Sequence, residues 1–278
     1  MTTTTKKEKA MFRIDMHVHT RGSDGVSTAE QIAQSALAAD LDGLCITDHH
    51  HTYTPEGLAV AAACRAVGLR VFFGCEYSAA EGHILVYGAD VDQLDLGQYP
   101  PMQDVIDKVR AAGGVAIPAH PWHGYTKGAI GAGLKKLRYV VAIEGVNGQL
   151  AVRTPAKNHA ATTWANANGV QMIGGSDAHH ASYVGVCFTE FEVPPQTDED
   201  LVDALKWNAA RACVNLGRKA VARVVWTTPM FKTWIKQEQA RAADQMDQAE
   251  AERRAYAKQL ALRFRTDRQA AMDKAAQE

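Results

Sequence analysis

The sequence predicts an α/β fold built on a mainly parallel sheet and followed by a C-terminal helical extension. Short apolar segments typical of buried strands alternate with helix-forming segments along residues 11–208, which is the pattern of βα units. Histidines and carboxylates follow directly after several of these apolar segments. Residues 235–278 contain neither proline nor glycine and are rich in alanine, glutamine and charged residues, as in a long helix or a helical hairpin.

Length and composition set broad limits on the class of protein. A chain of 278 residues can form one large α/β domain, alone or with an appendage. A net charge of −1 argues against a protein built mainly to coat nucleic acid or an anionic membrane. The five cysteines form no CxxC pair, which argues against a zinc knuckle or a disulfide framework. With no signal peptide and no apolar run of about 18 residues, we expect a cytoplasmic protein without a membrane partner.

The first strand is predicted where Met11, Phe12 and Ile14 lead into the segment Asp15-Met16-His17-Val18-His19. A loop of glycine, serine and aspartate follows it at residues 22–25. Because side chains alternate in a strand, Asp15, His17 and His19 should share one face, and Ile14, Met16 and Val18 the other. Two imidazoles side by side at a strand end suit a divalent metal ion.

The remaining elements follow in alternation. Ser27-Thr28-Ala29-Glu30 fits a capping box that opens a helix through about Ala39. Further strands are predicted over residues 43–47, 69–73, 83–87, 115–118, 140–143, 170–173 and 184–188, and helices over 55–67, 101–112, 154–167 and 198–208. About seven strands would allow closure into a barrel. We expect a disordered N-terminus over 1–10, one domain over 11–228 and a helical arm over 229–278.

Polar residues at the predicted strand ends are expected to meet. They are His17, His19, Asp24, Asp48, His49, Glu76, His83, His120, Asp177 and His179. Parallel βα folds place the carboxyl ends of their strands on one rim, where ligands bind. Unpaired buried polar groups are costly, and cations would satisfy them. Apart from Asp48, these residues could serve two or three divalent ions. The HExxH, EF-hand, P-loop and GxGxxG patterns are all absent.

At these residues the chain resembles the PHP (polymerase and histidinol phosphatase) family of metal-dependent phosphoesterases. The matching stretches are Asp15-Met16-His17-Val18-His19-Thr20, Ser23-Asp24-Gly25, Ile46-Thr47-Asp48-His49, Gly74-Cys75-Glu76, His83-Ile84-Leu85, Pro118-Ala119-His120-Pro121 and Gly175-Ser176-Asp177-Ala178-His179. They occur in the family's order and span roughly residues 11–220. The resemblance implies a distorted (β/α)7 barrel with a trinuclear centre of manganese, zinc or iron.

The resemblance also implies how the ligands divide. His17, His19, Glu76 and Asp177 would hold one ion; Glu76, as a bridge, would hold a second with His83 and His120; Asp24, His49 and His179 would hold a third. Asp24 stands where some members have histidine. The segment between His83 and His120 is too short for the subdomain inserted in some nucleotide-cleaving members. No serine or cysteine nucleophile is required, because an ion-bound hydroxide would attack phosphorus.

Several neighbouring residues have two interpretations. Arg21 could clamp a phosphate or lie solvated in its loop. Asp15 could orient a ligand imidazole, whereas Asp48 should support a ligand or the fold and should not bind an ion itself. Glu144 and Asn147, at another strand end, could contact the substrate. Some of His50, His51 and His180 could reach the site. His123 could line a substrate pocket, whereas Trp122 should be core and His159 should lie on the surface.

The sequence therefore favours a metal-dependent hydrolase of a phosphomonoester or phosphodiester, acting on a small molecule such as histidinol phosphate or on a nucleotide. One alternative is a non-catalytic metal-binding module that acts through its helical arm, and another is a nuclease acting on RNA or DNA ends. An amidohydrolase on a related barrel commonly uses a strand-borne lysine, and no predicted strand ends in one. The arm could be a solvated helix, or it could join copies into a homo-oligomer or bind another partner.

Overall fold

A computed structural model describes residues 11–123, 129–207 and 210–214. These residues belong to one compact unit. The segments predicted as a disordered N-terminus (1–10) and a helical arm (229–278) lie outside the described residues. Within the described residues, no helix has both the length and the apolar character needed to cross a bilayer.

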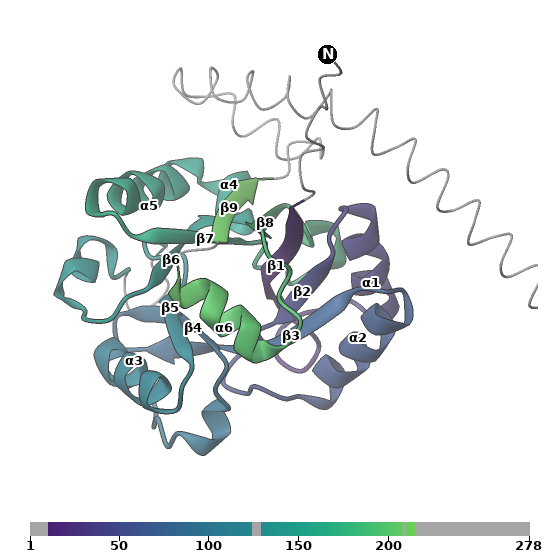
Figure 1. Ribbon diagram of the computed structural model, residues 1–278, viewed down its shortest axis with the longest axis horizontal. Helices are drawn as coiled ribbons and strands as arrows, with labels where there is room; N and C mark the ends of the chain where they lie inside the picture. The colour runs from purple at the N-terminus through teal and green to yellow at the C-terminus, as the bar shows by residue number, and fades with distance from the viewer. Residues whose placement is uncertain (1–10, 124–128, 208–209, 215–278) are drawn as a thin grey trace, which may run out of the picture. The chain divides into compact units, whose positions relative to one another are not determined.

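The described part of the chain has the predicted α/β character (Figure 1). Its strands are β1 (Phe12–Val18), β2 (Gly43–Ile46), β3 (Arg70–Ala79), β4 (Gly82–Tyr87), β5 (Val115–Pro118), β6 (Ala142–Asn147), β7 (Gln171–Gly175), β8 (Cys187–Phe191) and β9 (Ala210–Val214). Its α-helices are α1 (Ala29–Ala38), α2 (Pro55–Ala66), α3 (Met102–Ala111), α4 (Gly148–Arg153), α5 (Pro155–Asn168) and α6 (Asp198–Lys206). Short 3-10 helices are η1 (Val91–Gln93), η2 (Gly131–Lys136) and η3 (Ala181–Tyr183).

The sheet is mixed, so the prediction of a mainly parallel sheet was wrong. Seven strands pair in the order β5-β4-β3-β2-β1-β8-β9, and β6 pairs with β7 separately. Among the strands that the structure describes, only β1–β2, β2–β3 and β6–β7 are parallel pairs. The link between β3 and β4 shows the reason: only residues 80–81 connect them, and a parallel crossover needs a dozen residues or more. Helix α4 and strand β9 were not predicted.

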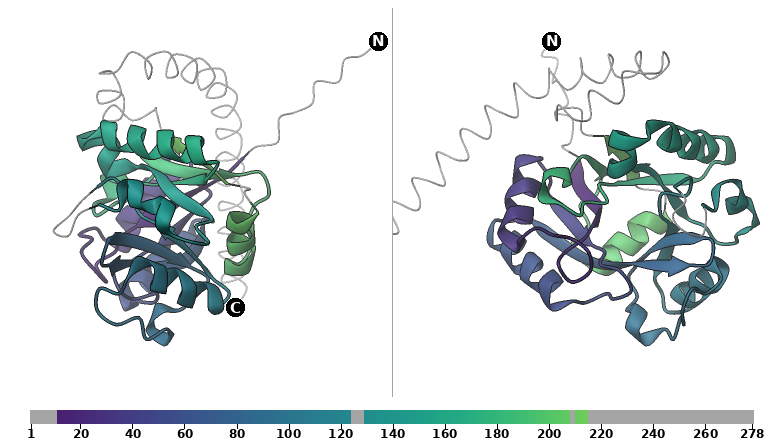
Figure 2. Two further views of the ribbon diagram at one scale, coloured as in Figure 1. Left: turned by 90° about the vertical axis from the view of Figure 1, so that its left-hand side faces the viewer. Right: turned by 180° about the vertical axis from the view of Figure 1, so that it is seen from behind.

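The sheet curls into a half-barrel, and the end of β7 is bonded to β1. His19 N donates to Ala178 O at 3.0 Å, and Ala178 N donates to His17 O at 3.3 Å. Figures 1 and 2 show β6 and β7 on the side where the curled sheet is open, across from β2–β4. The α/β class is confirmed, while the seven-unit barrel and its helical extension stay predictions.

The helices bury the two faces of the curled sheet differently. Inside the curl, Ile14, Met16 and Tyr87 pack with Leu201 and Leu205 of α6. Figures 1 and 2 together show this helix across one end of the curl, beside the strands. Outside it, α1 and α2 cover β1–β3, and α3 covers β4 and β5. Strands that are buried on both faces in this way have sequences that are nearly continuous in apolar residues.

One end of the half-barrel is closed by α6, which leaves the other end for ligands. Gln171, the first residue of β7, donates from Nε2 to Leu205 O at 2.8 Å, so α6 lies near the amino end of this strand. The predicted ligand Asp177 follows the carboxyl end of β7. The polar strand ends therefore gather away from α6, at the end where βα folds bind ligands.

Helix α1 begins one residue later than predicted. Thr28, not Ser27, is the N-cap: its side chain accepts from Gln31 N at 3.3 Å, and Gln31 Oε1 accepts from Thr28 N at 2.9 Å. Ser27 is used elsewhere, because its hydroxyl accepts from Ala181 N at 2.8 Å. The capping box was the right motif in the wrong register.

Candidate metal centre

Strand β1 delivers two histidines through an irregularity in its pairing. Its register with β2 shifts between Asp15 and Val18, and backbone groups there are bonded by side chains. Tyr87 Oη donates to Met16 O at 2.6 Å, and Val18 N donates to Thr47 Oγ1 at 3.1 Å. Val18 consequently packs outside the sheet with α1 and α2, whereas Met16 packs inside. The predicted strict alternation was therefore wrong for Val18.

The first group of ligand atoms consists of His17, His19, Glu76 and Asp177. The two imidazole Nε2 atoms lie 3.0 Å apart. Glu76 Oε2 is 3.2 Å from the His17 Nε2 and 3.1 Å from the His19 Nε2. Asp177 Oδ1 is 3.6 and 3.4 Å from the same two atoms. All four residues are buried.

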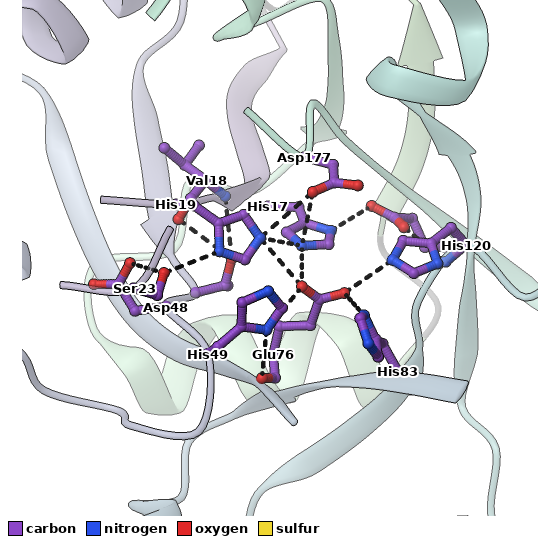
Figure 3. Close-up of polar contacts among 12 residues, drawn as sticks. His17, Val18, His19, Ser23, Asp48, His49, Glu76, His83, His120 and Asp177 are labelled. Carbon is purple, nitrogen blue, oxygen red and sulfur yellow. Dashed lines mark hydrogen bonds and ion pairs between the residues drawn. The ribbon is translucent and has the colours of Figure 1, made fainter. Parts of the chain in front are cut away.

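Glu76 uses its two oxygens for different neighbours. Oε2 faces the first group, while Oε1 is 2.9 Å from His83 Nδ1 and 2.9 Å from His120 Nε2. Glu76, His83 and His120 form the second group. The carboxylate thus lies between two sets of imidazoles (Figure 3).

The third group consists of Asp24, His49 and His179 together with His19. Asp24 Oδ2 is 3.1 Å from His179 Nε2 and 3.6 Å from His49 Nε2, and Asp24 Oδ1 is 3.6 Å from His19 Nδ1. The Asp24 side chain is 53% exposed, whereas His19 is buried. This group is therefore the open side of the centre. Sequence reasoning missed the second contact of His19, which belongs to the first and third groups at once.

The structure brings all nine predicted ligands into these three groups, in each of which the ligand atoms lie within 4.8 Å of one another. Their chemistry fits divalent ions. His17 Nδ1 is 2.9 Å from Glu144 Oε1, so a proton on Nδ1 leaves the Nε2 lone pair facing that of His19. Facing lone pairs and carboxylates repel unless protons or cations lie between them. Imidazole and carboxylate donors suit manganese, zinc or iron.

Electrostatics within the centre agree with this description. Burial by itself would lower the pKa of His17, but Glu76, Asp177 and Glu144 reverse this effect and raise it well above its usual value. Burial likewise opposes charge on His19, while hydrogen bonds to Asp177 and Glu76 raise its pKa to about 9. The same imidazoles hold the pKa of Glu76 well below its usual value despite burial. The carboxylates thus strongly favour positive charge among the ligand atoms of the centre.

Glu144, for which the sequence left a substrate contact open, instead contacts the predicted ligands and their backbone. It is buried, and besides contacting His17 its Oε2 accepts from His120 N at 2.8 Å and from Asn147 Nδ2 at 3.0 Å. Asn147, also buried, donates from the same nitrogen to Asp177 Oδ2 at 3.2 Å. Glu144 and Asn147 therefore tie the first and second groups together.

Asp15 does not orient an imidazole as predicted. Its carboxylate accepts from three backbone N–H groups, those of His17 at 3.3 Å and of Ser176 and Gly185 at 2.8 Å. Burial raises its pKa to about 6 against these hydrogen bonds. Asp15 consequently fixes the backbone of β1 and the segment after β7.

Asp48 has the structural role, one of the two that the sequence left open for it. Its carboxylate accepts from the hydroxyls of Thr20 at 2.6 Å, Ser23 at 2.9 Å and Thr54 at 2.7 Å, and from Thr20 N at 2.7 Å. These bonds join the loop after β1 to the start of α2. They hold the loop that carries Asp24.

Two ligands have strained backbones. His120 and Asp177 have φ values of 27° and 54°, in the left-handed region that residues with a Cβ seldom occupy. Glu144 accepts from His120 N, and Gln149 Nε2 donates to Asp177 O at 2.9 Å. Strain held by such bonds is typical of functional positions.

The other predicted positions divide by their contacts. Arg21 donates twice to Val26 O, at 3.1 and 2.9 Å, which holds its guanidinium in its own loop and not among the ligands. His51 contacts Asp92, His180 contacts Ser182, and His50 contacts Ser78. Trp122 packs in a core cluster with Trp164, as expected, and His159 is exposed, as expected. His123 lies beside the second group, with its ring 5.7 Å from that of His120.

Known proteins resemble this chain in a local family match and in fold. A family model described as PHP-associated matches residues 155–209. A two-domain protein from Bacteroides vulgatus, containing a predicted PHP-like metal-dependent phosphoesterase, superposes with a TM-score of 0.56 at 18% identity, over 77% of this chain and 69% of that one. PsfC from Pseudomonas syringae gives 0.55 at 19% identity, over 82% and 98%.

A third solved structure, an amidohydrolase from Chromobacterium violaceum with bound sulfate and no metal, gives a TM-score of 0.51 at 19% identity, over 73% of this chain and 98% of that one. No curated protein sequence matches the chain. At such identities the solved structures establish a shared fold. Together with the PHP-associated match, they confirm the predicted family resemblance.

Proposed function

We propose that this chain, which resembles the PHP family in a local family match and in fold, is a metal-dependent phosphoesterase that hydrolyses a small phosphorylated molecule or a nucleotide. Fold alone does not define an activity, so the proposal depends on the site. Its ligands would be the nine residues of the three groups, and its cofactors two or three ions of manganese, zinc or iron.

The observation that carries the proposal is the position of Glu76. One carboxylate oxygen lies 3.1–3.2 Å from the imidazole nitrogens of the first group, and the other lies 2.9 Å from those of the second. A carboxylate that serves two ligand sets is typical of centres with adjacent ions, which clamp a phosphoryl group. A site for a single structural ion has no need of a shared ligand.

Each residue would have a definite task in such an enzyme. When bound, the ions would supply a nucleophile at neutral pH and neutralise charge on the phosphoryl oxygens. Glu144 holds His17 so that its Nε2 faces the centre, and Asn147 fixes Asp177. The open third group, with Asp24 half exposed, provides the side from which substrate can enter.

The test is hydrolysis of 4-nitrophenyl phosphate, a monoester, and bis(4-nitrophenyl) phosphate, a diester, with manganese, zinc or iron and after chelation. We expect metal-dependent turnover of at least one ester, and loss of that turnover in Glu76→Ala. The amide 4-nitroacetanilide tests the alternative suggested by the amidohydrolase neighbour, and 5′-labelled RNA and DNA oligonucleotides test a nuclease. If the metal-loaded protein acts on neither ester, the proposal is wrong, and a non-catalytic metal-binding module becomes the better description.

A further inference from the structure

His123 and Lys157 form a contact at the edge of the second group. His123 N donates to His120 O at 2.7 Å, and the two rings meet edge to face at 5.7 Å. Lys157, near the start of α5, places its Nζ 3.0 Å from His123 Nδ1. A lysine ammonium is therefore one imidazole away from the predicted ligand His120.

The contact with His123 uses one of the three N–H donors of the Lys157 ammonium. An ammonium can only donate, so His123 Nδ1 must be the acceptor, which accounts for one of three N–H groups. Lys157 is half-buried, and among the described residues no carboxylate lies within ion-pair distance of it. Arg13, Arg138 and Arg211, by contrast, each pair with a carboxylate. A half-buried cation without a carboxylate is suited to binding an anion.

Helix stability does not explain Lys157 either. It lies in the first turn of α5, a 14-residue helix with no acidic residue in that turn. The helix dipole is positive at this end, so a lysine here is slightly unfavourable. The same dipole adds to the positive potential that an anion would meet.

We propose that Lys157 binds an anionic oxygen of the substrate beside the second group, that His123 positions it, and that the site consequently favours phosphomonoester dianions over phosphodiester monoanions. This inference rests on the proposed phosphoesterase function. Lys157 would contact the substrate, whereas His123 acts through Lys157.

The experiment compares Lys157→Met with a matched control, Lys135→Met, an exposed lysine of η2. In manganese-loaded protein, KM and kcat are measured for the monoester 4-nitrophenyl phosphate and the diester bis(4-nitrophenyl) phosphate. Orthophosphate binding is measured by calorimetry, and metal content and thermal unfolding show whether the centre and the fold persist. Loss of a charge-assisted hydrogen bond should raise KM for the monoester and weaken orthophosphate binding roughly tenfold, with the diester changed less than twofold.

His123 variants test the positioning role. His123→Leu removes the acceptor and should raise the monoester KM severalfold, whereas His123→Asn keeps an acceptor near the position of Nδ1 and should restore most of the loss. A purely structural role for His123 would make both variants lower thermal stability without separating their KM values.

The outcomes distinguish this inference from the proposed function. If wild type turns over an ester but Lys157→Met matches Lys135→Met in every constant, the inference fails and the function stands. An equal fall in kcat for both esters at unchanged metal content also overturns it. If wild type turns over neither ester while orthophosphate binding still depends on Lys157, the function fails and the anion site stands. Absence of both turnover and orthophosphate binding overturns both.

Discussion

Glu144→Gln tests whether a buried carboxylate sets the metal affinity of the centre. Glu144 Oε1 contacts His17 Nδ1 at 2.9 Å, and Oε2 accepts from His120 N and Asn147 Nδ2 at 2.8 and 3.0 Å. Glutamine has the same size but only one acceptor oxygen, so either amide orientation turns N–H groups toward buried donors. Outer-shell changes of this kind weaken metal binding about 10–100-fold, which corresponds to about 1.4–2.8 kcal/mol.

The assay is the manganese dissociation constant, measured by competition with a fluorescent chelator at fixed pH. The matched control is Glu192→Gln, because Glu192 makes an exposed ion pair with Arg211, and such surface pairs contribute little. We expect Glu192→Gln to bind manganese as wild type does. Equal affinities for wild type and Glu144→Gln would refute the reasoning, since they would mean that His17 keeps its orientation without the carboxylate.

Four further predictions concern the centre and its support. Glu76→Ala should abolish turnover and lower the metal content measured by elemental analysis, because two groups lose a shared ligand; retained activity would mean that the bridge is misassigned. Removing metal by chelation should lower the melting temperature, and a metal concentration of 100 Kd should restore about 2.7 kcal/mol, or about 5–10 °C; a melting temperature indifferent to metal would contradict the site. Tyr87→Phe removes the hydrogen bond to Met16 O and should lower the free energy of unfolding in urea by about 1–2 kcal/mol, whereas unchanged stability would show that the irregularity in β1 needs no such support. Deleting residues 235–278 should leave metal content and turnover intact while changing the assembly size seen by light scattering if the arm joins copies; loss of bound metal would place the arm in the site.

Much of the fold could be predicted from local sequence patterns. The apolar segments predicted as strands correspond to β1–β8, although β8 begins at Cys187 and not at 184. Strand direction could not be predicted in the same way. The antiparallel pairing of β4 with β3 follows from their short connection, but that of β8 with β1 joins residues far apart in sequence, and no local pattern encodes such a pairing.

The ligand set was more predictable than its support. His17, Glu76 and His120 each occur at or just beyond a strand within a recognisable motif, so their convergence followed from the rule that strand ends share a rim. The role of orienting an imidazole, which was open to Asp15, belongs to Glu144, because both are acids in strands and only their partners distinguish them. Asp15 meets backbone N–H groups, while Glu144 meets an imidazole.

The sequence by itself determined the α/β class, the nine candidate ligands and their order along the chain, because apolar periodicity and residue chemistry are local properties. The tertiary structure decided which atoms face one another: that the two oxygens of Glu76 serve different groups, that His19 belongs to two of them, and that Lys157 reaches His123. These contacts depend on strand curvature, on the β1 irregularity and on side-chain rotamers. They arise from packing between distant segments, which the order of residues along one segment does not specify.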